Sequence, residues 1–192
     1  MNTANKLTIL RILITPVFFA VLCIPFPHRH IPALLLFIGA AITDGMDGSI
    51  ARKRGIVTDF GKFLDPLADK MLTTAAYLAF IYLGYGFGIV AVTFIILTRE
   101  FLIMSLRLVS VGNGLVISAG FAAKLKTVFQ MIAIITIIVM EYAIWLFLGG
   151  FPPICFWIRV AYSVILWFTV VLAVVSGVQY FYQNKNQIDY KT

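Results

Sequence analysis

Residues 31–69 read IPALLLFIGAAITDGMDGSIARKRGIVTDFGKFLDPLAD, an apolar run that passes directly into a dense set of aspartates. The run from Ile31 to Thr43 would form a helix about 20 Å long, at about 1.5 Å per residue. Because the hydrocarbon core of a membrane is about 30 Å thick, this run alone is too short to cross it. We therefore expect the helix to continue through Asp44 and Asp47, which holds both carboxylates below the membrane surface.

The whole chain is too apolar for a water-soluble fold. Of its 192 residues, 61% are hydrophobic and 12% are charged, whereas soluble domains average about 45–50% and about 25%. In a membrane chain, the net charge of +7 indicates a cytoplasmic face beside anionic lipid, not nucleic-acid binding. Cys23 and Cys155 match no ligand spacing, so neither a disulfide nor a zinc site is predicted.

Apolar runs separated by polar residues, glycine and proline predict an all-α integral membrane protein. Six transmembrane helices are expected within a single domain, residues 1–192. The predicted spans are Leu7–Phe26, Ile31–Ala51, Phe60–Leu83, Ile89–Val109, Val128–Phe147 and Ile158–Phe181. Most Lys and Arg residues then fall at one face, and only Arg29 and Arg159 lie near the other. This asymmetry predicts that both termini are cytoplasmic.

Aspartates and small residues form one stripe on each of two consecutive predicted helices. At about 100° per residue, the stripes consist of Asp44, Asp47, Gly48 and Ala51 on the first helix and of Gly61, Asp65 and Asp69 on the second. A short basic connector makes the helices antiparallel neighbours, so the stripes can face each other. Four converging carboxylates would repel strongly at membrane depth, and cations would remove that cost. An all-oxygen donor set suits two Mg²⁺ or Mn²⁺ ions.

Three other interpretations of these acids have to be weighed. The acids would also neutralise the basic connector Arg52–Arg54, or line a water-filled crevice. The small residues favour a binding site instead, because Gly48, Ala51 and Gly61 let a bulky ligand approach the backbone. A cation transporter would also place carboxylates inside a bundle, but it needs them near the membrane midplane with access from both sides.

The spacing of the stripes resembles the signature of the CDP-alcohol phosphotransferases. The signature segment is Asp44-Gly45-Met46-Asp47-Gly48-Ser49-Ile50-Ala51-Arg52. Eight residues separate it from Gly61, three more separate Gly61 from Asp65, and three more separate Asp65 from Asp69. Every fixed position of the signature is present: four Asp, two Gly, one Ala and one Arg. The six-helix topology of the family agrees with the predicted spans, and the resemblance extends over most of the chain.

The resemblance implies a role for each signature residue. Asp44, Asp47 and Asp65 would hold two divalent ions, and Asp69 would add a ligand oxygen and act as the catalytic base. The residues implied for the cytidine-diphosphate pocket are Gly48, Ala51, Arg52 and Gly61, with Thr58 as a further contact. An acceptor hydroxyl would attack the phosphorus of a CDP-lipid on its lipid side, and CMP would leave.

The signature does not define the acceptor. Other segments, among them Gly61–Lys70 and Lys124–Thr127, resemble the bacterial phosphatidylglycerophosphate synthases within this family. That resemblance implies CDP-diacylglycerol and glycerol 3-phosphate as substrates. It also implies a multi-pass protein of the bacterial inner membrane, with a cytoplasmic active site and a homodimeric state. Inositol phosphate, serine and phosphatidylglycerol are the alternative acceptors.

Glycerol 3-phosphate is a dianion and needs cationic partners. Arg107, Lys124 and Lys126 are placed for this at the cytoplasmic ends of the predicted fourth and fifth helices. The two lysines would point about 200° apart on a helix, so only one faces the pocket easily, and Lys124 is slightly favoured. In the alternative, these lysines extend to phospholipid headgroups.

Polar residues inside the predicted spans need partners. Glu100 is expected to pair with Arg107, seven residues further on, whereas Arg99 is a candidate contact for the acceptor phosphate. Asn5 and Thr8 would either contact the nucleotide or cap the first helix, and capping is favoured. Two expectations concern the other face: Glu141 is structural or interfacial, and His28 and His30 are solvated.

Overall fold

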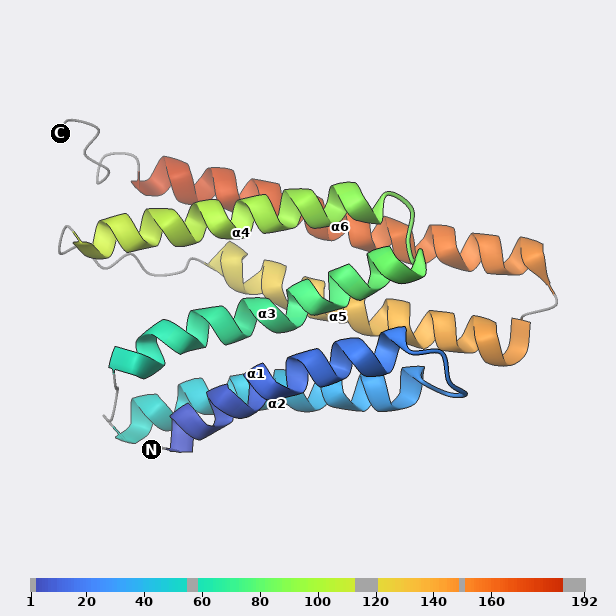
Figure 1. Cartoon of the computed structure of the whole chain (residues 1–192). Coiled ribbons are helices and arrows are strands. Elements are labelled where there is room, and N and C mark those ends of the chain that lie inside the picture. The colour runs from blue at the N-terminus through green and yellow to red at the C-terminus, as the bar shows by residue number, and fades with distance from the viewer. Residues whose placement is uncertain (1–2, 55–58, 113–120, 149–150, 185–192) are drawn as a thin grey trace.

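The computed structural model of the chain is a bundle of long helices (Figure 1). It describes residues 3–54, 59–112, 121–148 and 151–184, and these are helical except in short connections. The helices are α1 (Thr3–Cys23), α2 (His30–Arg54), α3 (Asp59–Leu83), α4 (Ile89–Gly112), α5 (Phe121–Ala143) and α6 (Pro152–Asn184), and a π-helical turn η1 (Ile144–Leu148) extends α5. The all-helical prediction and the expected order of six helices are confirmed in these residues.

Helix α2 shows the expected continuation beyond its apolar run. It extends from His30 to Arg54 and so includes Asp44 and Asp47. Its 25 residues correspond to a helix about 37 Å long. This length exceeds the hydrocarbon core of a membrane, whereas the apolar part alone would not.

Several helices are suited to a multi-pass membrane protein. Within the described residues, four segments are long and apolar enough to cross a membrane: Lys6–Cys23, Ile89–Leu106, Leu125–Phe147 and Pro152–Tyr182. Helices α2 and α3 carry shorter apolar stretches, His30–Thr43 and Lys70–Leu83, because their other turns contain the aspartates and basic residues. Crossing by all six helices therefore stays a prediction.

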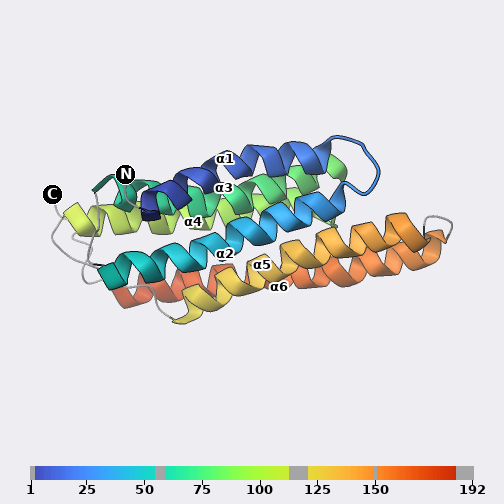
Figure 2. The ribbon, with the colours of Figure 1, turned by 90° about the horizontal axis from the view of Figure 1, so that it is seen from below.

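The two ends of the bundle differ in their chemistry. We call one end the aspartate end. Helix α2 ends there, after Asp44 and Asp47, and α3 begins there and continues through Asp65 and Asp69. Helix α1 begins and α6 ends at this end, on the left of Figures 1 and 2. The connections 24–29 and 84–88 lie at the opposite end. This arrangement brings the four aspartates, which lie on two different helices, to one end of the molecule.

Apolar side chains fill the bundle and also cover its outside. The buried core includes Phe18, Phe37, Phe80, Ile134 and Leu166. Large apolar side chains are exposed all around the bundle, among them Leu13, Phe94, Phe147 and Val164. Such a continuous exposed apolar surface is typical of a protein whose surroundings are lipid.

Helix α1 packs against both α2 and α3, and these two helices contact each other much less extensively. The expectation that α2 and α3 are antiparallel is confirmed, whereas their direct contact is smaller than expected. The physical reason is that a short connector fixes the direction of two helices but not the neighbour each one packs against. Three buried alanines on α3, Ala75, Ala76 and Ala79, provide a surface that another helix can approach closely.

At the opposite end, the connection between α3 and α4 is fastened to α6. The Trp167 indole Nε1 donates to the Phe87 carbonyl at 3.0 Å. Next to this bond, Gly88 has a φ of 73°, a backbone conformation that favours glycine. A Cβ at Gly88 would lie 2.9 Å from Trp167 Cζ2. Both conformation and space therefore require glycine at this position.

Candidate active site

The four signature aspartates lie on the helical backbone at the aspartate end. Asp44 and Asp47 lie in the second half of α2, and Asp65 and Asp69 lie in the first half of α3. The helical state of both segments supports the predicted stripes, because each stripe depends on the helical repeat. The side chains of these aspartates are outside the part that the structure describes, and so is Thr58.

The donor set at this end fits a divalent metal. Two antiparallel helices bring four carboxylates to one end of the bundle, and carboxylate oxygens are the ligands that Mg²⁺ and Mn²⁺ prefer. Among the residues whose side chains the structure describes, no group of three or more His, Cys, Asp or Glu residues could hold a metal ion. The aspartate stripes are thus the predicted metal site, and histidine or cysteine clusters in the described part offer no alternative.

A cluster of charged side chains begins at Lys70 of α3, directly after Asp69, and extends to α4 and α5. Lys70, the residue after Asp69, places its Nζ 3.1 Å from Glu100 Oε2 on α4. Lys126 on α5 forms an ion pair with Glu100 Oε1, and Arg99 Nη1 lies 3.3 Å from the same oxygen. The side chains of Glu100 and Lys126 are only 10% and 2% exposed. We call these four residues the Glu100 cluster; one carboxylate holds cations from three helices.

Arg99 also fastens α4 to α6. Its Nη2 donates to Ser176 Oγ at 3.0 Å, and its Nε donates to the Ala173 carbonyl at 3.3 Å. The absence of a side chain at Gly177 gives the arginine stem room, since a Cβ there would lie 3.3 Å from Arg99 Cγ. Arg99 therefore has a clear packing role, and its predicted contact with an acceptor phosphate stays a prediction.

The two lysines of the fifth helix can now be placed on one helical segment. Helix α5 includes both Lys124 and Lys126, so the two positions lie about 200° apart around the helix axis, as expected. The Lys126 side chain is buried and faces Glu100. The side chains of Lys124 and Arg107 are outside the described part, so the expected Glu100–Arg107 pair stays a prediction.

The predicted capping role of Asn5 and Thr8 is wrong. Helix α1 begins at Thr3, so both residues lie within the helix and not at its cap. Thr8 is 1% exposed, and it lies one turn before Arg11, which is 2% exposed. The side chains of Thr8 and Arg11 therefore face the interior of the bundle. A contact of Asn5 or Thr8 with the nucleotide stays a prediction.

Polar residues at the opposite end form a separate cluster. Glu141 is buried, and its carboxylate accepts bonds from Arg159 Nε at 2.9 Å and Nη2 at 3.0 Å, and from the Tyr162 hydroxyl at 2.5 Å. Its predicted structural role is confirmed. The prediction that His30 is solvated is wrong: the residue is 4% exposed, and its Nε2 lies 3.0 Å from the Tyr85 hydroxyl.

Comparison with known proteins identifies the family. A family model described as CDP-alcohol phosphatidyltransferase matches residues 1–175. The chain belongs to the CDP-alcohol phosphatidyltransferase family. The match extends from α1 into α6, so it includes the aspartate stripes and the Glu100 cluster together. The resemblance that the signature indicated is therefore confirmed for nearly the whole chain.

Bacterial relatives are similar over most of their length. A Bacillus subtilis protein named CDP-diacylglycerol–glycerol-3-phosphate 3-phosphatidyltransferase is 35% identical in an alignment 195 residues long, and the alignment covers 95% of this chain and 95% of that protein. A Wigglesworthia glossinidia brevipalpis protein of the same name is 33% identical, over 95% of this chain and 94% of its own. A probable phosphatidylglycerophosphate synthase of Mycobacterium tuberculosis H37Rv is 36% identical, over 93% and 79%.

Two charged residues of the bundle interior were not assigned a role from the sequence. Lys70 was not assigned a role, although it follows Asp69 and contacts Glu100. Arg11 was not assigned a site role either, although it lies inside an apolar span. A charged side chain in a membrane helix almost always faces the bundle interior, and this rule alone would have indicated Arg11.

Proposed function

We propose that this chain transfers the phosphatidyl group from CDP-diacylglycerol to glycerol 3-phosphate and so makes phosphatidylglycerophosphate and CMP. The observation that carries the proposal is the similarity to the Bacillus subtilis enzyme of that name over 95% of both chains. The complete aspartate signature on α2 and α3 supports the reaction class. The cation-rich Glu100 cluster supports an acceptor that carries a phosphate.

The carboxylates of Asp44, Asp47, Asp65 and Asp69 would hold two divalent ions, Mg²⁺ or Mn²⁺. When bound, such ions offset the negative charge of a pyrophosphate and of the leaving CMP. The chain's own contribution is to present four oxygen ligands from two helices whose direction is fixed by a short connector. Asp69 must be bound less tightly than the other three if it is also to accept a proton.

Asp69 acts on the acceptor in the proposed reaction. Its carboxylate takes the proton from the acceptor hydroxyl, and the hydroxyl oxygen attacks the phosphorus on the lipid side of the pyrophosphate. A new oxygen–phosphorus bond forms to glycerol 3-phosphate as the bond from that phosphorus to the CMP phosphate breaks. The proton leaves Asp69 to solvent, and CMP carries away the electron pair of the broken bond.

Residues of three helices, together with Thr58, would hold the nucleotide. The contacts we propose are Gly48, Ala51, Arg52, Thr58 and Gly61, together with Asn5 and Thr8 on α1. The packing of α1 against both α2 and α3 supports this assignment, because it brings α1 next to the two helices that carry the signature. The small residues would let the pyrimidine and ribose approach the backbone.

Lys126 is the residue that we favour for the phosphate of the acceptor. It is buried, and Glu100 links it to Lys70, the neighbour of Asp69. We propose that these bonds keep the ammonium group near the helical turn that carries the predicted base, where the phosphate of a short acceptor would lie. Lys124, Arg107 and Arg99 are the further proposed contacts, and the cations together would compensate the dianion.

The orientation and assembly follow from the same proposal. We place both termini and the aspartate end in the cytoplasm of a bacterium, because most Lys and Arg residues lie at that face. CDP-diacylglycerol would then reach the site from the inner membrane, and glycerol 3-phosphate would reach it from the cytoplasm. A homodimer is proposed from family analogy alone.

The proposed reaction is tested by comparing acceptors. Purified protein in detergent, with CDP-diacylglycerol and Mg²⁺, is given glycerol 3-phosphate, inositol phosphate, serine or phosphatidylglycerol separately, and CMP release is measured. We expect release with glycerol 3-phosphate to exceed release with the others by about tenfold or more. Preference for another acceptor would reject the substrate assignment, and no release with any of them would favour the cation transporter.

A further inference from the structure

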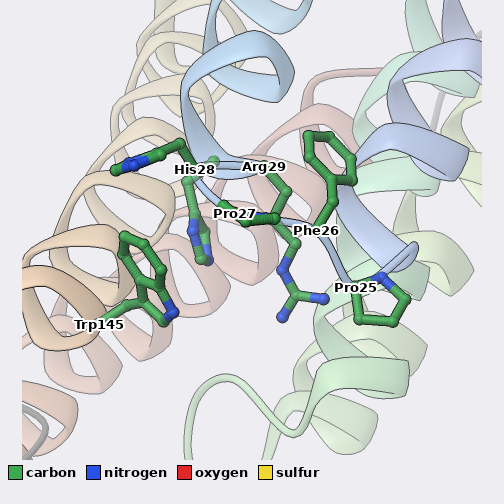
Figure 3. Close-up of a pocket in the computed structure, with 7 residues that line it drawn as sticks. Pro25, Phe26, Pro27, His28, Arg29 and Trp145 are labelled. Atoms are coloured by element: carbon green, nitrogen blue, oxygen red, sulfur yellow. The ribbon is translucent and has the colours of Figure 1, made fainter.

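A cavity of about 370 Å³ opens at the opposite end of the bundle, far from the aspartates. It is lined by the α1–α2 connection, residues 25–30, and by Trp145 of the π-helical turn η1. Figure 3 shows the Arg29 guanidinium and the Trp145 indole on two sides of this opening. The volume falls within the range of small-molecule sites, and the proposed function makes no use of it.

Arg29 brings an uncompensated positive charge to this cavity. Its Nη2 donates to the Tyr85 hydroxyl at 3.2 Å, and its Nη1 donates to the Cys23 carbonyl at 3.5 Å. None of the ion pairs among the residues that the structure describes involves Arg29. Two of the five guanidinium donors are thus used by neutral groups. The others are available to a ligand.

The neighbouring groups do not neutralise Arg29. Glu141 is the acidic residue of this end within the described part, and its two oxygens are occupied by Arg159 and Tyr162. Burial raises the pKa of the Tyr85 hydroxyl, and the nearby Arg29 opposes this shift. Tyr85 therefore stays protonated and holds the arginine without cancelling its charge.

The shape of the cavity is fixed by an unusual backbone conformation at His28. Its φ is 58°, in the left-handed region that few residues other than glycine adopt. The ring is held by a 2.9 Å bond between Nδ1 and the Tyr142 hydroxyl, and its centre lies 4.8 Å from that of Trp145. These contacts preserve the strained turn, and such strain is concentrated at binding sites.

We propose that this cavity binds the phosphate of an anionic phospholipid headgroup, with Arg29 as its main partner. Guanidinium groups pair with phosphate through two parallel hydrogen bonds. The position between the ends of α1 and α5 is where headgroups lie if these helices cross the membrane, and Trp145 suits that interface. The described residues of the lining include no carboxylate, so they offer no ion pair to the ammonium of a zwitterionic headgroup.

The proposal is tested by counting retained lipids. Purified protein is incubated with dioleoyl phosphatidate, with dioleoyl phosphatidylcholine, or with phosphatidate plus millimolar inorganic phosphate, and bound lipid is measured by native mass spectrometry. We expect phosphatidate to be retained, phosphatidylcholine to be retained at least about fivefold less, and inorganic phosphate not to compete. Equal retention of both lipids, or displacement by inorganic phosphate, would overturn the proposal.

Two variants assign the retained lipid to this cavity. Arg29→Gln removes the charge, and Phe26→Glu adds a carboxylate to the lining and keeps the bonds from Arg29 to Tyr85 and Cys23. Each is expected to lower phosphatidate retention at least about fivefold. Lys6→Gln, at the exposed start of α1 near the aspartate end, is the matched control. This variant should retain as much phosphatidate as the unchanged protein. Full retention in Phe26→Glu would overturn the proposal even if Arg29→Gln fails to fold. This test measures lipid retention and not CMP release. A negative result would therefore reject the lipid site and leave the proposed function untouched.

Discussion

Lys126 on α5 and Glu100 on α4 form an ion pair in the interior of the bundle, where their side chains are 2% and 10% exposed. The same carboxylate also contacts Lys70 on α3 and Arg99 on α4. A buried carboxylate that holds several cations is costly unless every member is well placed. The cluster therefore fixes the position of Lys126 relative to α3, the helix that carries Asp65 and Asp69.

Glu100→Gln is expected to impair binding of the acceptor more than binding of the CDP-lipid. Without the charge, the cations repel one another and Lys126 loses its position. The loss of a charge-assisted bond of about 1.5–3 kcal/mol predicts a rise of about tenfold or more in KM for glycerol 3-phosphate. Steady-state CMP release with each substrate varied in turn measures this effect.

Glu141→Gln is the matched control for that variant. It removes the same charge at the opposite end, where Glu141 pairs with Arg159 and Tyr162. Its expected effect is a lower thermal unfolding midpoint, with an unchanged KM for glycerol 3-phosphate. If both variants raised this KM equally, the Glu100 cluster would be structural and would not position the acceptor site.

Lys126→Gln is predicted to reduce kcat/KM for glycerol 3-phosphate more than Lys124→Gln does. Lys126 faces the interior beside Glu100, and the position of Lys124 lies about 200° further round the same helix. Loss of one charge-assisted phosphate contact predicts a decrease of about tenfold or more for Lys126→Gln. A larger decrease for Lys124→Gln would reverse the assignment and restore the slight preference that the sequence indicated.

Asp69→Asn is expected to lower turnover by about 10²-fold or more, because the amide cannot accept the hydroxyl proton. Binding of CDP-diacylglycerol, measured by isothermal titration, should be largely retained. Asp189→Asn makes the same chemical change outside the signature and should keep normal turnover. Normal turnover in Asp69→Asn would reject Asp69 as the base.

Gly88→Ala is predicted to lower the stability of the protein. The substitution places a side chain at a positive φ and a Cβ 2.9 Å from Trp167, at a cost of about 1–3 kcal/mol. Gly39→Ala is the control, because a Cβ there meets nothing within 4 Å; alanine in this helix should be neutral or stabilising by up to about 1 kcal/mol. Equal unfolding midpoints for the two variants in detergent would contradict the assigned role of Gly88.

The sequence was sufficient for the helices but not for all of their contacts. The short apolar run Ile31–Thr43 required α2 to continue through Asp44, and the structure confirms this. Hydropathy is a property of neighbours along the chain, so it predicts helices. It does not predict a contact between two helices, such as that of Lys126 with Glu100. Sequence spacing therefore suggested Arg107, on the same helix, as the partner of Glu100. Similarly, the burial of His30 depends on Tyr85, which lies 55 residues away.

The central claim is that the aspartates of α2 and α3 support a metal-dependent phosphatidyl transfer to glycerol 3-phosphate. The most direct test is CMP release from CDP-diacylglycerol and glycerol 3-phosphate by the purified chain, before and after treatment with EDTA. We predict that EDTA abolishes release, that added Mg²⁺ or Mn²⁺ restores it, and that Asp65→Asn is not restored at the same ion concentration. Release that persists after EDTA, or full activity of Asp65→Asn, would contradict the claim.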